Sequence, residues 1–222
     1  MDSEMQNFKL ILIGHPRCGS RSISTFLSKV GLICGHEKLE KDGMVSWWHT
    51  GNYMGQKLFR NGKKEPKHFS SKIVGSYIRN PLDAIPSIVV ENEHMDRDNN
   101  SFRFRSRLLM KWYGTDISKM GPLTAAATSY VLWNNKAREI SELSAPIKVE
   151  QPELQEIMAL AGIPATEEYE ASLTNSEKLN TTEVKFGKKK RNFSKAEIIE
   201  SVVDDRSVSA SLEEYLNLYH EK

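Results

Sequence analysis

A glycine-bounded segment near the N-terminus has the residue types and spacing of an anion-binding turn. Gly14 and Gly19 enclose the residues His-Pro-Arg-Cys, and Ser-Arg-Ser follows, between an apolar run and an amphipathic helical pattern. Glycines let the backbone turn tightly so that its N–H groups converge, and a helix N-terminus adds about half a positive charge. Arg17 offers a planar fork of donors that suits phosphate or sulfate oxygens. The segment therefore predicts a site for a phosphate group or a close mimic.

The same spacing occurs in the phosphate-binding loop of P-loop ATPases, but the residues that follow it differ. That loop continues with Lys and then Ser or Thr. This chain has Ser20 and Arg21 instead, and it shows no clear apolar strand ending in an Asp that would hold Mg²⁺. These differences count against an ordinary ATPase, and a P-loop-type phosphotransferase is kept as an alternative.

A second segment places an arginine and a serine where both can reach one anion. The run Lys72–Ile78 is typical of a buried strand, Arg79 follows it, and Asn80 and Pro81 then provide an N-cap and a first helical residue. Ser87 comes eight residues after Arg79, about two helical turns into the helix. Because Arg79 leaves the carboxyl end of a strand, we expect the two side chains to face one phosphate.

The two segments, PRCGSRSISTFL and KIVGSYIRNPLDAIPSIV, resemble the two cofactor-binding motifs of the sulfotransferase family. The first is similar to the family's 5′-phosphosulfate loop and the second to its 3′-phosphate element, in the same order along the chain. The resemblance implies a P-loop-like α/β fold and 3′-phosphoadenosine 5′-phosphosulfate (PAPS) as the sulfuryl donor, with no metal. It also implies that PAPS is bound by Arg17, Cys18, Gly19, Ser20, Arg21, Ser22, Arg79 and Ser87.

Similarity to the family is patchier in the rest of the chain. The stretch PIKVEQPELQEIMALAGIP resembles a shortened form of a strand and helix of the family. The basic run Lys185–Arg191 resembles the late loop that closes over the 3′-phosphate, which implies that Gly187 and Lys188 also bind the cofactor. A solvated basic loop is the alternative for this run. We expect residues 164–192 to form a flexible loop that covers the cofactor, within a single domain of residues 1–222.

The implied reaction is in-line transfer of a sulfuryl group to a hydroxyl or amine, and it needs a base. Arg17 would stabilise the charge on the leaving phosphate oxygen. Glu37 is the first choice for the base, because GLICGHEK resembles the Cys-Gly-x-Glu stretch of protein-tyrosine and some carbohydrate sulfotransferases. His36 and His68 are alternatives, since imidazole titrates near neutrality. The acceptor class stays open among carbohydrates, phenols, lipid alcohols and tyrosine peptides.

Composition narrows the remaining function classes. The chain has 222 residues, 31 Lys plus Arg against 29 Asp plus Glu, and a net charge of +2. This balance argues against a generic nucleic-acid binder, although a noncatalytic nucleotide- or polyanion-binding module is kept as an alternative. The basic residues of 103–111 are expected to form a solvated face. Two cysteines, an acidic N-terminus and the lack of a long apolar run favour a soluble cytoplasmic protein without a zinc site, export signal or membrane span.

The elements expected to position these groups alternate between strands and helices. Strands are expected at 8–13, 32–34, 72–78 and 146–149, and helices at 23–30, 80–89, 101–112, 122–143, 152–161 and from 194 onward, with 36–71 mostly irregular. Pro86 is expected to kink its helix, and Ser194 with Glu197 forms a capping box. The alternation predicts an α/β fold with a parallel sheet, helices on both faces and a ligand at the carboxyl ends of the strands.

Overall fold

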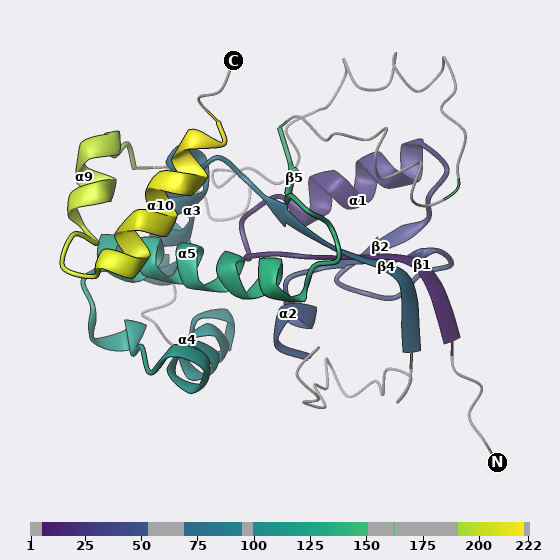
Figure 1. The fold of residues 1–222 in the computed structure, drawn as a ribbon, viewed down its shortest axis with the longest axis horizontal. Coiled ribbons are helices and arrows are strands. Elements are labelled where there is room, and N and C mark those ends of the chain that lie inside the picture. The colour runs from purple at the N-terminus through teal and green to yellow at the C-terminus, as the bar shows by residue number, and fades with distance from the viewer. Residues whose placement is uncertain (1–5, 53–68, 95–99, 151–161, 163–190, 220–222) are drawn as a thin grey trace. The chain divides into compact units, whose positions relative to one another are not determined.

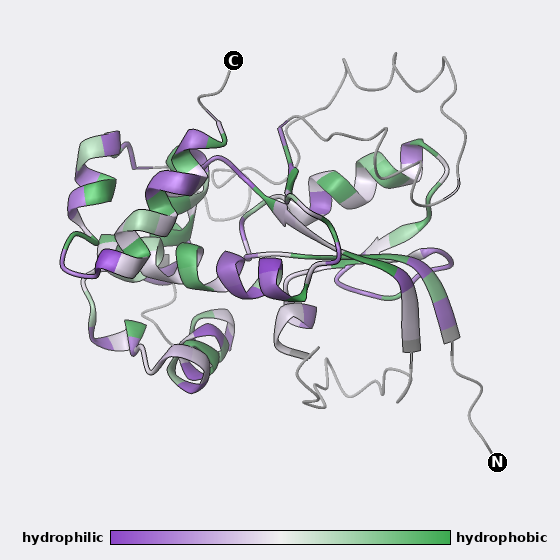
Figure 2. Ribbon diagram, viewed as in Figure 1, coloured by the Kyte–Doolittle hydropathy of each residue, from purple (hydrophilic) through white to green (hydrophobic). Residues whose placement is uncertain are grey.

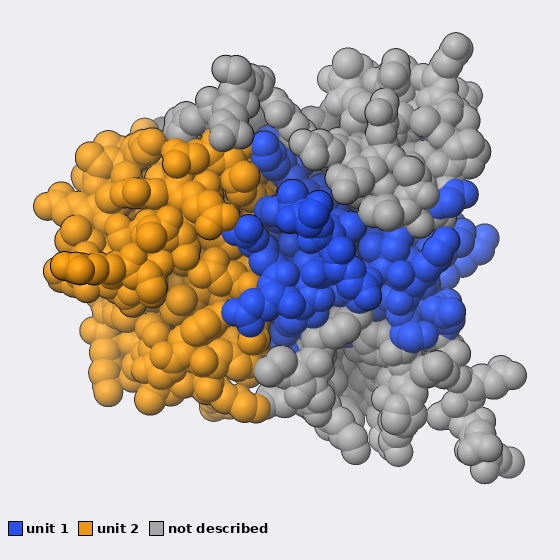
Figure 3. Space-filling view, viewed as in Figure 1, with its two compact units in different colours: residues 1–14, 19–77, 137–179 blue, residues 15–18, 78–136, 180–222 orange. Residues whose placement is uncertain are grey.

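The computed structural model describes residues 6–52, 69–94, 100–150, 162 and 191–219 (Figure 1). The chain divides into two compact units, coloured blue and orange in Figure 3. Unit 1 consists of Met1–Gly14, Gly19–Tyr77 and Ala137–Leu179, and unit 2 consists of His15–Cys18, Ile78–Lys136 and Asn180–Lys222. Each unit is therefore assembled from segments that are distant in sequence. A single domain over residues 1–222 stays a prediction.

Unit 1 contains a five-stranded parallel sheet. The strands are β1 (Gln6–Ile13), β2 (Cys34–His36), β3 (Gly43–Ser46), β4 (Phe69–Ile78) and β5 (Ile147–Lys148), in the order β2-β3-β1-β4-β5. β1 pairs in parallel with β3 on one side and β4 on the other, and Leu12 stands opposite both Val45 and Gly75. The continuous apolar run of β1 suits this central position, because a central parallel strand is buried on both faces. The chain therefore has the predicted α/β fold with a parallel sheet.

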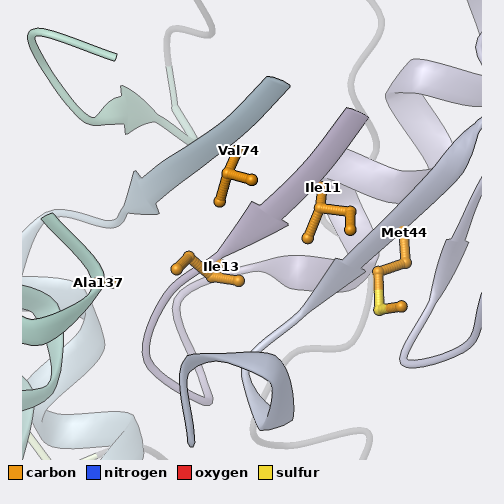
Figure 4. Packing of buried hydrophobic residues seen from close by; sticks show 5 residues of the cluster. All are labelled: Ile11, Ile13, Met44, Val74 and Ala137. Carbon is orange, nitrogen blue, oxygen red and sulfur yellow. The ribbon is translucent and has the colours of Figure 1, made fainter. Parts of the chain in front are cut away.

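The core of the sheet is built from apolar side chains of three neighbouring strands. One buried cluster contains Ile11, Ile13, Met44, Val74 and Ala137 (Figure 4). Ala137 belongs to α5 (Pro122–Ile140), which brings a helix against this face of the sheet. Leu10 and Leu12 alternate with the two isoleucines and are also buried, on the opposite face of the sheet. Burial of apolar surface on both faces, at about 25 cal/mol per Å², is the main stabilising contribution to this unit.

Helices flank the sheet of unit 1. In Figure 1, α1 (Ser20–Lys29) lies above the strands and α2 (Trp48–Asn52) lies below them. α1 buries Ile23 and Leu27, four residues apart, as its apolar spacing predicts.

The edge of β4 beside the two-residue strand β5 receives side-chain hydrogen bonds. The backbone N–H of Val74 donates to Oε2 of Glu142 at 2.8 Å, and the N–H of Ser76 donates to Oγ of Ser141 at 3.1 Å. These side chains thus provide acceptors for backbone N–H groups that would otherwise lack a hydrogen bond at a partly buried edge of the strand.

Unit 2 is helical. Its elements are α3 (Pro81–His94), α4 (Asn100–Tyr113), the 3-10 turn η1 (Ile117–Lys119), α5 as far as Lys136, α9 (Lys195–Glu200) and α10 (Arg206–Asn217). Tyr130 and Trp133 of α5 and Tyr215 of α10 are fully buried, and the two tyrosine rings meet edge to face at 5.7 Å. Figure 2 shows green and purple residues alternating around α4, the amphipathic pattern of a helix packed on one side.

One prediction of irregular structure differs from the structure. The segment 36–71 was expected to be mostly irregular, which is wrong at β3 and α2. β3 has only Met44 and Val45 as apolar residues, too few for a periodic signal, and pairing with β1 and β2 makes it a strand. The helix predicted after Asn80 is present with Pro86 inside it, as α3, and it continues to His94. The helix predicted at 152–161 and the loop predicted at 164–192 lie outside the described residues, apart from residues 191 and 192.

The predicted capping signals are confirmed where the structure describes them. Asn80 begins α3 by accepting a hydrogen bond from the N–H of Leu82 at 3.0 Å, and Ser194 and Glu197 form a reciprocal capping box at α9. Among the helices in the described ranges, none combines the length and apolarity needed to cross a membrane.

Candidate anion-binding site

The segment between β1 and α1 turns through two residues with positive φ. Arg17 has a φ of 70° and Gly19 a φ of 85°, and α1 begins at Ser20. A Cβ atom on Gly14 would lie 2.5 Å from the carbonyl oxygen of Tyr77, and one on Gly19 would lie 2.6 Å from Cγ1 of Val149. Both glycines are therefore required by close packing. The segment leaves the carboxyl end of the central strand, with β3 and β4 on opposite sides, which is where open α/β sheets bind ligands.

Arg17 contacts the serine of the second predicted segment. Its Nε donates a hydrogen bond to Oγ of Ser87 at 3.1 Å, across 70 residues of sequence. Both residues belong to unit 2, and Ser87 is buried. Arg79 directly follows β4, and its carbonyl oxygen accepts a hydrogen bond from the hydroxyl of Tyr130 at 2.6 Å. The structure thus brings the arginine of the first segment against the serine of the second.

Burial and neighbouring charges act in opposite directions on the Arg17 guanidinium. Burial lowers the pKa of Arg17, the carboxylate of Glu91 raises it, and the positive charge of Arg79 lowers it. Arginine nevertheless stays cationic in proteins. Two guanidinium groups that repel one another are stabilised by an anion placed against both, and this is the electrostatic character expected of an anion site.

A buried arginine of α4 lies in the same unit. The side chain of Arg105 is fully buried. Its Nη1 donates to Oγ of Ser129 at 3.1 Å and its Nη2 donates to Oδ1 of Asn92 at 2.8 Å, while Oε2 of Glu91 lies 3.7 Å from Nη2. Burial lowers the pKa of Arg105, and the charge of Glu91 opposes this shift. One guanidinium therefore joins α3, α4 and α5.

The expectation that residues 103–111 form a solvated basic face is wrong for Arg105. Arg103, Arg107 and Lys111 are exposed, as expected. The signal that would have separated Arg105 from them is helical spacing, because α4 buries Phe102, Arg105, Leu108 and Leu109. Positions three and four apart share one face of a helix. An arginine in register with buried apolar residues is thus expected to be buried with its partners.

His15, the first residue after Gly14, is anchored by α5. Its backbone N–H donates to Oδ1 of Asn134 at 3.2 Å, and its Nε2 lies 2.9 Å from Oγ of Ser129. Nδ1 donates to the carbonyl oxygen of Pro16, so Nε2 is the acceptor of a neutral imidazole. Burial and the charge of Arg105 lower the pKa of His15 well below its ordinary value, outweighing the hydrogen bond to Pro16. The sequence did not single out His15.

The residue predicted to act as a base lies in a buried cluster of unit 1. Glu37 follows β2 with a φ of 57°, and it is 6% exposed. Its Oε2 accepts a hydrogen bond from Oγ of Ser46 at 2.7 Å, and its Oε1 lies 3.5 Å from the backbone nitrogen of Trp47. Nε2 of His36 lies 3.8 Å from Oε1 of Glu37 and 3.1 Å from Oγ of Ser20. The predicted residues Ser20, His36 and Glu37 are therefore brought together.

His49 extends this cluster and was not predicted as part of it. Its Nδ1 lies 3.3 Å from Oγ of Ser46. Because the Ser46 hydroxyl donates to Glu37, it is the acceptor for His49. No spacing in the sequence indicates this contact, which depends on the pairing of β2 with β3 and on the turn into α2.

The remaining predicted site residues are distributed as follows. Cys18 is fully buried, with its backbone N–H donating to the carbonyl of His15 at 3.1 Å. Arg21 is exposed on the first turn of α1, and Ser22 beside it is partly exposed. His68, Gly187 and Lys188 lie outside the described residues. In the part of the chain that the structure describes, no three His, Cys, Asp or Glu side chains are grouped to hold a metal ion.

In unit 2, the charges of Glu91 and Arg79 act on Arg17, and Glu91 also lies beside Arg105. A guanidinium group such as that of Arg17 can bind a phosphate or sulfate group through charge-assisted hydrogen bonds. No protein-family model, curated protein or solved structure matches this chain. What can be inferred about its activity therefore rests on these residues and on the two sequence segments.

Proposed function

We propose that the protein is a PAPS-dependent sulfotransferase with a P-loop-like fold, which moves a sulfuryl group to a hydroxyl or amine acceptor. The observation that carries the proposal is the 3.1 Å hydrogen bond between Arg17 and Ser87. These residues come from the two segments that resemble the cofactor-binding motifs of sulfotransferases. Two unrelated chance matches have no reason to meet in the fold, whereas two halves of one cofactor site must.

The donor groups in unit 2 would bind the anionic parts of the proposed cofactor. PAPS would supply the activated sulfuryl group, and adenosine 3′,5′-bisphosphate would be the product. Arg17 would bind the phosphate at the loop and stabilise the negative charge that develops on its leaving oxygen. Arg79 and Ser87 would hold the 3′-phosphate through charge-assisted and hydroxyl hydrogen bonds. Cys18, Gly19, Ser20, Arg21, Ser22, Gly187 and Lys188 stay predicted cofactor-binding residues, and the last two lie outside the described residues.

Glu37 is the proposed general base, with His36 and His68 as alternatives. A carboxylate can take the proton of the acceptor as the new bond to sulfur forms. The hydrogen bond from Ser46, at 2.7 Å, fixes the orientation of the Glu37 carboxylate. A fixed orientation favours proton transfer along one direction.

A noncatalytic nucleotide-binding module is the second candidate, and the surroundings of Glu37 favour it. The side chain is 6% exposed, one oxygen already accepts from Ser46, and the other faces the backbone N–H of Trp47. A buried carboxylate engaged by two donors is less available to a substrate proton. Such a module would bind the bisphosphate and transfer nothing.

Two measurements on the purified full chain separate these candidates. Calorimetry with adenosine 3′,5′-bisphosphate measures binding, and labelled PAPS offered with phenols, sugars, lipid alcohols and tyrosine peptides, with magnesium omitted, measures transfer. Magnesium-independent sulfation supports the proposed enzyme. Binding with no transfer to any acceptor supports the noncatalytic module, and magnesium-dependent transfer of phosphate from ATP supports a phosphotransferase. Absence of bisphosphate binding contradicts the first two candidates.

A further inference from the structure

The four residues from His15 to Cys18 form a tight turn in unit 2. The backbone N–H of Cys18 donates to the carbonyl oxygen of His15 at 3.1 Å, so these two are the first and fourth residues of a β-turn. Pro16 is the second residue, and Arg17, the third, has a φ of 70°. Proline fixes a negative φ, and a negative φ followed by a positive one defines a type II turn.

Arg17 occupies a position in this turn that favours glycine. The third residue of a type II turn needs a positive φ, which glycine adopts at no steric cost and other residues adopt with strain. The other three residues of the turn are buried, whereas Arg17 is partly exposed and its Nε donates to Oγ of Ser87 at 3.1 Å. The backbone conformation therefore gives no reason for an arginine here, and the contacts of its guanidinium group do.

Two side chains of α5 hold the first residue of the turn. Oδ1 of Asn134 accepts a hydrogen bond from the backbone N–H of His15 at 3.2 Å, and Oγ of Ser129 lies 2.9 Å from Nε2 of the ring. Nδ1 of the same ring donates to the carbonyl oxygen of Pro16, inside the turn. A strained conformation persists only where the surrounding structure over-determines it. These buried contacts provide that constraint on the residues that precede Arg17.

We propose that His15 and Asn134 are positioning residues of the candidate anion site, which hold the turn in the conformation that directs Arg17 toward Ser87 and the bound anion. The inference rests on the proposed function in that Arg17 binds an anion, but it does not require sulfuryl transfer. A binding group that is already held in place loses less conformational freedom when its ligand arrives. Loss of either positioning residue therefore weakens anion binding by way of Arg17, without any direct contact to the anion.

The next residue of α5 provides a matched control. The hydroxyl of Tyr215 donates to Oδ1 of Asn135 at 2.8 Å, and Nδ2 of Asn135 donates to Oγ of Ser211 at 3.2 Å. Both partners belong to α10. Asn135 is thus the same residue type on the same helix of unit 2, with hydrogen bonds to a different element.

The test is calorimetric titration of the full chain with adenosine 3′,5′-bisphosphate. We expect Asn134→Ala to raise Kd by about five- to tenfold and Asn135→Ala to change it by less than about twofold. In the Arg17→Ala background, adding Asn134→Ala is expected to change Kd by less than about twofold, because the group that Asn134 positions has been removed. A general structural role would weaken binding equally in both backgrounds.

Variants of His15 test the same role through its side chain. His15→Leu removes the ring nitrogens and is expected to raise Kd as Asn134→Ala does. His15→Gln places an amide oxygen where Nε2 can be replaced as an acceptor, so it is expected to restore part of the affinity. Equal affinities of the Leu and Gln variants would show that the hydrogen bonds of the His15 side chain do not position the turn.

Urea unfolding tests the strained turn without any ligand. Arg17→Gly and Arg17→Ala both lose the guanidinium group, but only glycine adopts a positive φ without strain. The glycine variant is therefore expected to have the higher urea midpoint, which reverses the usual order of the two residues. A higher midpoint for Arg17→Ala would contradict the strained turn on which the inference depends.

The remaining outcomes separate this inference from the proposed function. Wild-type affinity in Asn134→Ala, an equal loss in Asn135→Ala, or an undiminished effect in the Arg17→Ala background overturns the inference. If circular dichroism shows that Asn134→Ala does not fold, Asn134→Leu fills the same space without an acceptor, and the same result is expected. If wild type does not bind the bisphosphate, the proposed donor is contradicted, and pyrophosphate becomes the probe for the same variants. Failure of wild type to bind either probe contradicts both proposals.

Discussion

Oγ of Ser129 lies 2.9 Å from Nε2 of His15 and accepts a hydrogen bond from Nη1 of Arg105 at 3.1 Å. Ser129 has one proton to donate, and it goes to His15, whose own proton is engaged by the carbonyl of Pro16. The hydrogen bonds therefore run in one direction, from α4 through α5 to the loop after β1. This order requires a neutral imidazole, because a protonated His15 would lose its acceptor and add a second cation beside Arg105.

The free energy of unfolding is expected to fall as pH decreases below about 6.5, because of His15. Burial and the charge of Arg105 lower the pKa of His15 in the folded chain. At a pH between this lowered pKa and the ordinary pKa, the unfolded state therefore binds more protons than the folded state. The loss approaches about 1.4 kcal/mol per pH unit at most and stops below the folded pKa. Urea unfolding from pH 8 to 5, compared between wild type and His15→Gln, measures it. Parallel pH profiles for the two proteins would contradict this assignment.

Arg105→Lys is expected to lower the free energy of unfolding by about 1–3 kcal/mol. Lysine keeps the charge but lacks the planar fork that reaches both Ser129 and Asn92, so buried acceptors lose partners. Arg107→Lys is the matched control on the exposed side of α4 and is expected to change stability by less than about 0.5 kcal/mol. Chemical denaturation of the two variants provides the comparison. Equal stabilities would show that the Arg105 hydrogen bonds are not stabilising.

The thiol of Cys34 is expected to resist alkylation in the folded chain. Burial, together with the negative charge of Asp42, raises the pKa of Cys34 to about 12, against a smaller opposing effect of Lys9. At pH 8 the thiolate fraction is then on the order of a thousandfold below that of an unfolded thiol. Iodoacetamide labelling followed by peptide mass spectrometry, with and without urea, measures the difference. Rapid labelling of Cys34 without urea would contradict its burial.

Glu37→Gln is expected to abolish turnover while leaving bisphosphate affinity nearly unchanged, if Glu37 is the base. The amide can still accept from Ser46 but cannot take a proton. Glu40→Gln is the control, because Glu40 is a nearby carboxylate paired with Lys38. Steady-state sulfation rates and calorimetry separate the two effects. Full activity of Glu37→Gln would transfer the role to a histidine.

Elements next to the site were predictable because their signals are local. The apolar run of β1, the Asn80 cap of α3 and the capping box at Ser194 each act over a few neighbouring residues, and the structure has them where they were expected. The two glycines of the first segment likewise match positions where packing leaves no space for a side chain. Short-range patterns therefore located the candidate loop.

The partners of the buried charges in unit 2 were not predictable from such patterns. Arg105 was expected at the surface because of its residue type, although its helical spacing groups it with Phe102 and Leu109. Its hydrogen-bond partners in the interior are contributed by α3 and α5. Glu91 gave no signal, because its neighbour Arg105 comes from a different helix. Both predicted segments were recognised in the sequence, but the contact between Arg17 and Ser87 depends on the tertiary fold.

Calorimetric titration of Arg17→Ala and Arg79→Ala with adenosine 3′,5′-bisphosphate tests the shared cofactor site most directly. Each variant is expected to weaken binding by about 2–3 kcal/mol, a factor of roughly 30 to 150 in Kd, because each removes a charge-assisted contact. Arg107→Ala, on the exposed face of α4, is expected to bind like wild type. Wild-type affinity in both Arg17→Ala and Arg79→Ala would contradict the site.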